Sequence, residues 1–368
     1  MSRSAAQPLP PPDRDRFEIR AAMPADNEGL LVLTRLTPMS GRIALRIDRD
    51  PDFFALVRHR GRSEVFVAVR DDELVACFSV TIAEVYVGGC VRRGAYIADL
   101  KTRPGLSFTR VLPRLLHAAG EYAQVHDVEL VWCVVAAGNE RVAPLLGGRS
   151  GLPPFVPAGR FVVDELVNIG VMRAARSAYV IDEASACDTE ALDVLRDSFH
   201  RVRELAPASS ADAPDGTIAR LAARHGSRIV AALDLFDPDR LKHNVLLGAP
   251  LSTRLLLNVL RPVSNAFGGP RLPRIGEAAR LAYIRRFACE AGHTAAFAAL
   301  VTRARAIAAN HGFTFTAIGL HERDPLRSAL AWMPRFSFSS FSYVASLQSP
   351  SVTDAVSGGV PVQDYSFV

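Results

Sequence analysis

The chain has 368 residues, of which 49% are hydrophobic and 22% charged, with a formal net charge of +5 at pH 7. This length and composition are typical of a soluble globular protein with two domains of ordinary size. They exclude a membrane-spanning protein, because no run of about 18 apolar residues is present.

The N-terminus reads as a tail. Residues 1–12 are rich in proline, alanine and serine and lack the apolar centre of a secretion signal. We therefore expect a disordered segment over residues 1–15 and a cytoplasmic protein.

Strands and helices alternate along the first half, as the spacing of apolar residues and the capping residues indicate. In chain order we expect a strand at 17–21, a helix at 26–36, strands at 64–69, 74–87 and 95–102, a helix at 109–125, a strand at 129–135, a helix at 139–146 and a strand at 161–169. This order predicts a mixed α/β sheet covered by helices.

The second half repeats this plan. We expect a strand at 178–182, a helix at 189–205, strands at 228–236, 242–247 and 281–289, a helix at 294–311 and strands at 313–320 and 337–347. A linker is expected near 172–177, a mobile loop at 206–216 and a mobile tail from 349 onward. The prediction is two tandem domains, 16–174 and 175–348, followed by a C-terminal tail over 349–368.

Residues 96–116 join a predicted strand to a predicted helix through a short loop. The first turn of such a helix presents unpaired backbone N–H groups and a positive dipole end, which suit a phosphate. With the order of elements around it, this segment resembles the GCN5-related N-acetyltransferase (GNAT) family. In that family the fourth strand and the following loop hold the pyrophosphate of acetyl-CoA.

The loop departs from the family pattern of Gln or Arg, two arbitrary residues, Gly, one residue, and Gly or Ala. With Pro104 in register, Ser107, Arg110 and Leu112 occupy the three defined positions. Glycine lets backbone amides approach a phosphate without a Cβ in the way, so this is a degenerate loop. Asn139 matches a position where the family often contacts the cofactor, and it also suits a helix cap. The resemblance implies that acetyl-CoA or another acyl-CoA contacts Leu100, Thr102, Ser107, Phe108, Thr109, Arg110, Val111, Leu112 and Asn139.

The second half resembles, more narrowly, a group of bacterial tandem GNAT proteins. The matching features are the strand–turn–strand at 233–245, Leu-Pro-Arg-Ile-Gly at 272–276, Gly-Leu-His-Glu-Arg-Asp-Pro-Leu at 319–326 and the aromatic strand at 336–347. The loop at 290–294 has a single glycine and no neighbouring arginine. We expect this half to shape the acceptor site or to serve a structural role.

Transfer of an acyl group to an amine needs a polarised thioester, a proton acceptor and a donor for the departing thiolate. Asp99, on the fourth strand, is the first candidate base, although a carboxylate bonded to a neighbouring loop is an alternative. Glu84 is a second candidate base, or else a solvated strand residue. Tyr343 is the candidate proton donor, and Tyr96 is the candidate acceptor-site residue, with core packing as the alternative for both.

The predicted function is N-acyl transfer, most simply acetyl transfer, from CoA to a small-molecule amine by direct attack in a ternary complex. The basic net charge also suits a polyanionic donor, so an acyl carrier protein or an aminoacyl-tRNA is one alternative. A non-catalytic GNAT pseudoenzyme that binds a ligand or partner is another.

The five scattered cysteines lack metal spacing, so no metal is expected. Two fused copies predict a monomer or a weak dimer.

Overall fold

The computed structural model describes residues 17–39, 44–106, 108–139, 142, 146–148, 153–168, 178–208, 215–266 and 271–368. For residues 108–110, 252, 256, 260, 263 and 265 the backbone alone is described. The predicted helix at 139–146 lies mostly outside these residues.

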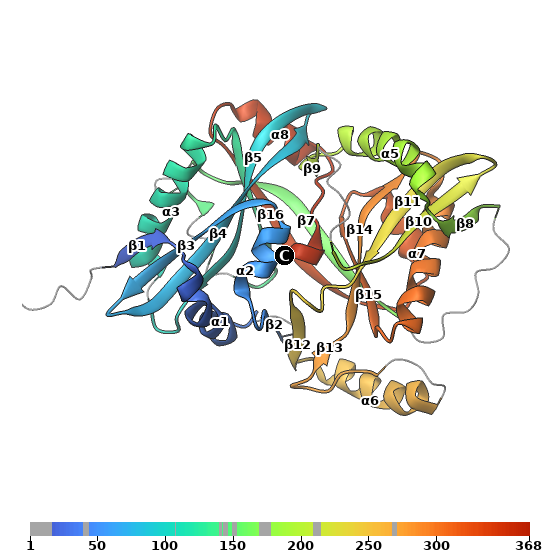
Figure 1. The fold of residues 1–368 in the computed structure, drawn as a ribbon, viewed down its shortest axis with the longest axis horizontal. Coiled ribbons are helices and arrows are strands. Elements are labelled where there is room, and N and C mark those ends of the chain that lie inside the picture. The colour runs from blue at the N-terminus through green and yellow to red at the C-terminus, as the bar shows by residue number, and fades with distance from the viewer. Residues whose placement is uncertain are drawn as a thin grey trace, which may run out of the picture.

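The first half of the chain alternates strands and helices, as predicted (Figure 1). Its elements are β1 (Glu18–Ala21), η1 (Pro24–Asp26), α1 (Asn27–Leu36), β2 (Ala44–Asp48), α2 (Phe53–His59), β3 (Arg62–Arg70), β4 (Glu73–Val87), β5 (Cys90–Thr102), α3 (Phe108–Val125), β6 (Leu130–Ala136) and β7 (Val156–Val167).

The second half repeats the order of the main strands and helices. Its elements are β8 (Val180–Glu183), η3 (Ala186–Asp188), α5 (Thr189–Arg201), β9 (Ala206–Pro207), β10 (Thr217–His225), β11 (Arg228–Phe236), β12 (His243–Gly248), α6 (Leu251–Ala266), β13 (Ala278–Ala279), β14 (Leu281–Cys289), α7 (Thr294–Asn310), β15 (Phe315–His321), η4 (Pro325–Leu330), β16 (Arg335–Ser346), α8 (Pro350–Gly358) and η5 (Tyr365–Phe367).

One long mixed sheet joins the two halves. Its strands lie in the order β1-β3-β4-β5-β6-β16-β7-β15-β14-β11-β10-β8, with β9 paired to β4. At its centre the halves exchange strands, because β16 of the second half pairs with β6, and β7 of the first half pairs with β15. A small sheet, β13-β12-β2, also combines both halves.

The fourth strand of each half has the same two features. β5 runs parallel to β6 only where 94–97 pair with 130–133, and β14 runs parallel to β15 only where 281–283 pair with 315–317. Beyond these short ladders each pair of strands diverges. Each fourth strand also carries a bulge at a non-glycine residue with positive φ, Asp99 at 56° and Arg286 at 46°.

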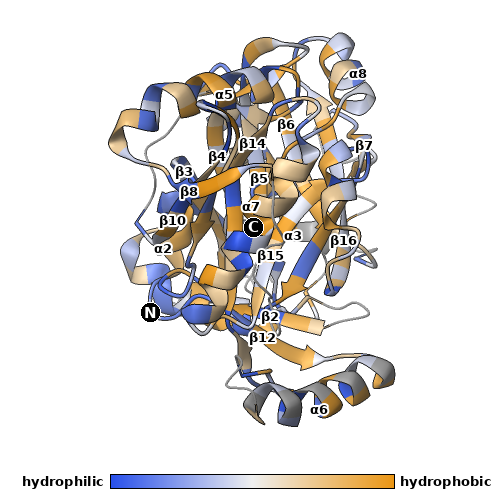
Figure 2. Cartoon of the chain, turned by 90° about the vertical axis from the view of Figure 1, so that its right-hand side faces the viewer, coloured by the Kyte–Doolittle hydropathy of each residue, from blue (hydrophilic) through white to orange (hydrophobic). Residues whose placement is uncertain are grey.

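Each half has its own apolar core on one face of the sheet. α3 packs on β3 and β4 around Phe78 and Leu115, and α7 packs on β10 and β11 around Phe297 and Leu300. α6 lies at one end of the molecule, away from both cores (Figures 1 and 2). No described helix has the length and apolar character needed to cross a membrane.

The segment predicted as a mobile C-terminal tail is instead built into the structure. Residues 349–368 form α8 and η5, and Tyr365 and Phe367 are buried. Lys242 is 2% exposed, and its Nζ donates to the main-chain oxygens of Tyr365 (3.0 Å) and Val368 (2.9 Å). The expectation of a mobile tail was wrong because the partners of this segment come from distant parts of the chain.

The predicted mobile loop at 206–216 is also partly wrong. Ala206 and Pro207 form β9, which pairs with Tyr86 and Val85 of β4. Residues 209–214 of that loop lie outside the described residues.

Candidate functional site: a cavity between the two halves

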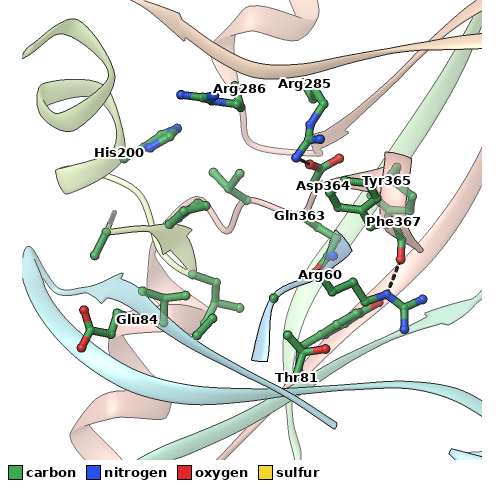
Figure 3. Close-up of a pocket in the computed structure, with 18 of the residues that line it drawn as sticks. Arg60, Thr81, Glu84, His200, Arg285, Arg286, Gln363, Asp364, Tyr365 and Phe367 are labelled. Carbon is green, nitrogen blue, oxygen red and sulfur yellow. Dashed lines mark hydrogen bonds and ion pairs between the residues drawn. The ribbon is translucent and has the colours of Figure 1, made fainter. Parts of the chain in front are cut away.

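A cavity of about 780 Å³ lies between the halves and is lined by both (Figure 3). Residues 81–85 of β4 form one wall, and residues 284–287 of β14 with α5 form the opposite wall. Residues 362–367 of the C-terminal segment run between the two walls. The volume is within the range of small-molecule sites.

The first-half end of the cavity is aromatic. Tyr96 and Trp132 line it with their ring centroids 5.7 Å apart. Burial raises the pKa of the Tyr96 hydroxyl, so this group stays protonated at neutral pH. The prediction that Tyr96 lines the acceptor site is compatible with this placement.

The second-half end of the cavity is cationic. Arg196, Arg285 and Arg286 line it together with His200. Figure 3 shows the Arg286 guanidinium directed toward His200 and that of Arg285 directed toward Asp364. The Arg285–Asp364 ion pair has an N–O distance of 2.9 Å.

A fully buried carboxylate, Asp234, holds this cationic end in place. It accepts from Arg196 at 2.8 Å, and Arg220 and Arg286 approach it at 3.4 and 3.7 Å. Burial and the nearby charges of Arg203 and Arg196 lower the pKa of His200 to about 4. His200 is therefore a neutral imidazole at physiological pH.

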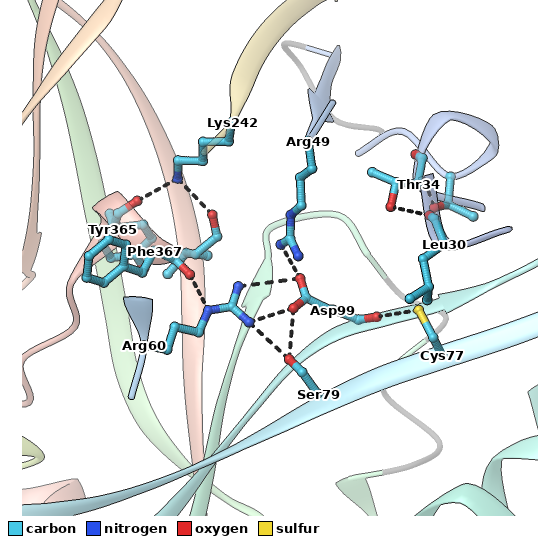
Figure 4. Close-up of polar contacts among 12 residues, drawn as sticks. Leu30, Thr34, Arg49, Arg60, Cys77, Ser79, Asp99, Lys242, Tyr365 and Phe367 are labelled. Carbon is cyan, nitrogen blue, oxygen red and sulfur yellow. Dashed lines mark hydrogen bonds and ion pairs between the residues drawn. The ribbon is translucent and has the colours of Figure 1, made fainter. Parts of the chain in front are cut away.

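Asp99 occupies the corresponding place in the first half, but it belongs to a different cluster (Figure 4). Its carboxylate pairs with Arg49 and with Arg60 (2.5 Å), and Ser79 donates to it at 2.8 Å. Burial alone would raise the pKa of Asp99, but the two guanidiniums hold it well below its usual range.

This enclosure of Asp99 disfavours the predicted role of base. A carboxylate that is fully occupied by two guanidiniums is a poor proton acceptor. The described residues that line the cavity include Arg60 and do not include Asp99. Arg60 also donates from Nε to the oxygen of Phe367 at 2.6 Å, so the Asp99 cluster braces the C-terminal segment.

The other predicted catalytic residues lie apart from each other. Glu84 lines the cavity from β4, where its side chain is 57% exposed and 3.9 Å from Arg93. Tyr343 lies on β16 opposite Cys133 of β6, half-buried, and is not among the described residues that line the cavity.

The predicted cofactor positions lie where β5 ends and α3 begins. Leu100, Val111 and Leu112 pack into the apolar core, and Thr102 is buried. The side chains of Val111 and Leu112 thus face inward, so among the described parts of this turn the backbone is what can meet a phosphate. Ser107 lies outside the described residues, as do the side chains of Phe108, Thr109 and Arg110.

Asn139 follows β6 and is exposed, with its N–H donating to Ala136. In the second half, Phe287 of β14, Leu320 of β15 and Leu330 of η4 belong to one apolar cluster. Among the described residues, no group of three His, Cys, Asp or Glu side chains could hold a metal ion.

Sequence reasoning missed Arg196, His200, Arg285 and Arg286. A signal for Arg286 was available, because aligning the repeated fourth strands places Arg286 opposite Asp99, the residue singled out in the first half. The cationic cluster itself had no local signal, since Asp234 and its arginines are spread over β10, β11, β14 and α5.

N-myristoyltransferases are among the solved structures with a similar fold. The Saccharomyces cerevisiae enzyme with bound myristoyl-CoA shares 12% identity over 98% of this chain and 92% of that chain, with a TM-score of 0.61. The same enzyme with myristoyl-CoA and inhibitors shares 12% identity over 97% of this chain and 88% of that one, also with a TM-score of 0.61. The chain has a tandem GNAT-like fold.

The tandem GNAT-like fold confirms the fold class and the resemblance inferred from residues 96–116. At 12% identity the likeness concerns the fold alone. No family model and no curated protein sequence matches the chain.

Proposed function

We propose that this protein is an N-acyltransferase that moves an acyl group from CoA to an amine bound in the cavity between the halves. The observation that carries the proposal is the first-half fourth strand, β5. It leaves β6 after Ile97, bulges at Asp99 and leads into the first turn of α3, while Tyr96 on the same strand lines the cavity. Donor and acceptor regions thus meet along one strand.

The donor in this proposal is an acyl-CoA, with acetyl and longer acyl chains as the candidates. Its phosphates would bind the backbone N–H groups at the start of α3, where Val111 and Leu112 already face the core. Its pantetheine arm would enter between the diverging ends of β5 and β6. The solved neighbours, which bind myristoyl-CoA, support an acyl-CoA as the donor class.

The chemistry is direct attack of the amine nitrogen on the thioester carbonyl. The C–N bond forms, the C–S bond breaks, the amine loses one proton and the CoA thiolate gains one. A backbone N–H at the β5 bulge would polarise the carbonyl. We assign the proton acceptor to Glu84, the carboxylate of β4 that lines the cavity, since the surroundings of Asp99 oppose that role.

The test is calorimetric titration of the full chain with acetyl-CoA and with myristoyl-CoA, beside Arg110→Glu and the matched control Arg228→Glu. We expect micromolar binding that Arg110→Glu weakens at least tenfold and Arg228→Glu leaves unchanged, because Arg228 is an exposed second-half residue. Absence of binding at about 1 mM, a limit of roughly 4 kcal/mol, would exclude the free acyl-CoA donor.

Turnover is measured as thiol release with a panel of amines. We expect Glu84→Gln to lower kcat without weakening donor binding. Two other donors fit a basic protein, an acyl carrier protein and an aminoacyl-tRNA. Because both are polyanions, steep salt dependence of binding would separate them from free CoA. Absence of product with every donor would identify a GNAT pseudoenzyme.

A further inference from the structure

The cationic end of the cavity has no role in the acyl-transfer chemistry proposed above. We propose that Arg286 and Arg285 bind an oxyanion there, so that the acceptor is an amine that also carries a carboxylate or a phosphate. This inference rests on the proposed function for the acceptor role, while the anion site itself stands on the geometry of β14.

Several guanidiniums share few close carboxylate contacts at this end of the cavity. The guanidiniums of Arg196, Arg220 and Arg286 share one carboxylate, Asp234, and only Arg196 makes a close hydrogen bond to it. Asp193 and Asp197 also line the cavity from α5, where Asp197 pairs with Arg201, and Asp364 is paired with Arg285. An anionic ligand would give Arg286 a closer partner than Asp234, which lies 3.7 Å away.

Arg286 retains unused donor capacity. Its side chain is 15% exposed, and its Nη1 is buried without a hydrogen-bond partner among the described residues. Arg285 is 9% exposed, and its Nε and Nη1 are also buried without a hydrogen-bond partner among the described residues. A buried donor without a partner is costly, and a guanidinium is suited to two parallel bonds with an oxyanion.

The backbone at Arg286 holds the side chain at this place. A φ of +46° is unfavourable for a long side chain, and strained residues of this kind are concentrated at functional sites. In the first half the same bulge carries Asp99, which two arginines neutralise completely. The bulge of the second half thus carries a positive charge where the bulge of the first half carries a negative one. The charge of Arg286 is only partly neutralised by its neighbours.

The two ends of the cavity have complementary chemistry. Tyr96 and Glu84 line the end beside β5, where the thioester would lie, and Arg286 lines the end beside β14. The apolar residues Ile82, Leu205 and Phe287 line the same cavity. An acceptor that reaches both ends would place its amine at β5 and its acidic group at β14.

The experiment measures binding of matched pairs of amines to the full chain without an acyl donor, by calorimetry at low and high salt. The pairs are leucine and leucinamide, 6-aminohexanoate and hexylamine, and O-phosphoethanolamine and ethanolamine. Inorganic phosphate alone serves as a probe of the anion site. The carboxylate and phosphate pairs distinguish the two sources of the oxyanion.

We expect at least one acidic member to bind tenfold or more tightly than its neutral partner. Arg286→Gln should abolish this preference, Arg286→Lys should retain part of it, and Arg228→Gln should leave it unchanged. Arg285→Gln is the second variant, should Arg286→Gln prove poorly folded. The absence of any preference in the wild type, or a preference that both glutamine variants keep, would overturn the inference.

The two proposals fail in different ways. Anion binding that depends on Arg286 without acyl transfer from any donor would retain the site and reject the transferase. Acyl transfer to neutral amines as fast as to acidic ones would retain the transferase and reject the anion site.

Discussion

Two buried carboxylates, Asp99 and Asp234, each gather arginines from several elements. Asp99 joins Arg49 and Arg60, which lie 50 and 39 residues away in the sequence. A buried ion pair of this kind adds little net stability, but removal of one partner leaves an uncompensated charge. Asp99 is therefore expected to matter for stability more than for proton transfer.

Asp99→Asn should lower the free energy of unfolding by about 3–5 kcal/mol, since two buried guanidiniums would lose their counter-charge. Ser79→Ala removes one hydrogen bond to the same carboxylate and should cost only about 1 kcal/mol. Urea denaturation at pH 7 measures both values. A loss below 1 kcal/mol for Asp99→Asn would contradict the assigned role.

His200 makes stability depend on pH. Its pKa is about 4 in the folded protein, because of burial and the charges of Arg203, Arg196 and Arg286, and about 6.5 when unfolded. Between pH 4 and pH 6.5 the His200 side chain therefore binds a proton more readily in the unfolded chain than in the folded protein. The contribution of His200 to stability is complete above about pH 6.5 and falls as the pH drops toward 4.

Between pH 7.5 and pH 5 we expect this residue to account for about 1–2 kcal/mol of lost stability. His200→Gln should remove that part of the pH dependence, whereas His117→Gln, at an exposed position, should leave it intact. Urea denaturation at both pH values measures the difference. Equal pH dependence in the wild type and His200→Gln would show that another group is responsible.

At the scale of elements, the C-terminal segment depends on Lys242. Its ammonium donates to two main-chain oxygens and lies 4.7 Å from the ring of Tyr283. Lys242→Met should leave those oxygens unpaired and destabilise the segment by about 1–3 kcal/mol.

Hydrogen exchange tests this prediction. Exchange of residues 359–368 should become faster in Lys242→Met, and Arg254→Met, at an exposed position of α6, should leave it unchanged. Unaltered exchange in the first variant would mean that the apolar contacts of Tyr365 and Phe367 hold the segment without the lysine.

Some elements could be predicted from sequence almost to the residue. β11 and β14 have the expected bounds, because each is rich in apolar residues on both faces, as a strand buried on both faces requires, although Asp234 interrupts β11 and Arg285 and Arg286 interrupt β14. β2, α2, β10 and α6 were not predicted, since their apolar spacing is short or mixed.

The pairing of strands could not be predicted in the same way. β7 and β16 carry apolar patterns that suit either neighbour, so nothing local indicates that they exchange places. The burial of Lys242 likewise depends on carbonyl groups more than 120 residues away. The candidate site shares this property, since its residues come from both halves.

At the scale of the whole molecule, strand exchange makes the two GNAT-like halves one structural unit. Residues 130–136 of β6 pair with 340–346 of β16, and 161–167 of β7 pair with 315–321 of β15. A first half without β16 would expose one side of β6 along its full length. Such an unpaired apolar edge favours aggregation over folding.

The exchange predicts how fragments behave. A fragment of residues 1–174 should not fold alone, whereas co-expression with residues 175–368 should restore a folded complex, because the cut lies outside the described elements. Circular dichroism and size-exclusion chromatography of the separate and combined fragments measure this, with the full chain as the control. Cooperative unfolding of the isolated first fragment would show that β6 and β7 form a stable sheet without their partner strands. The two halves would then be independent domains, and the cavity between them would depend on docking alone.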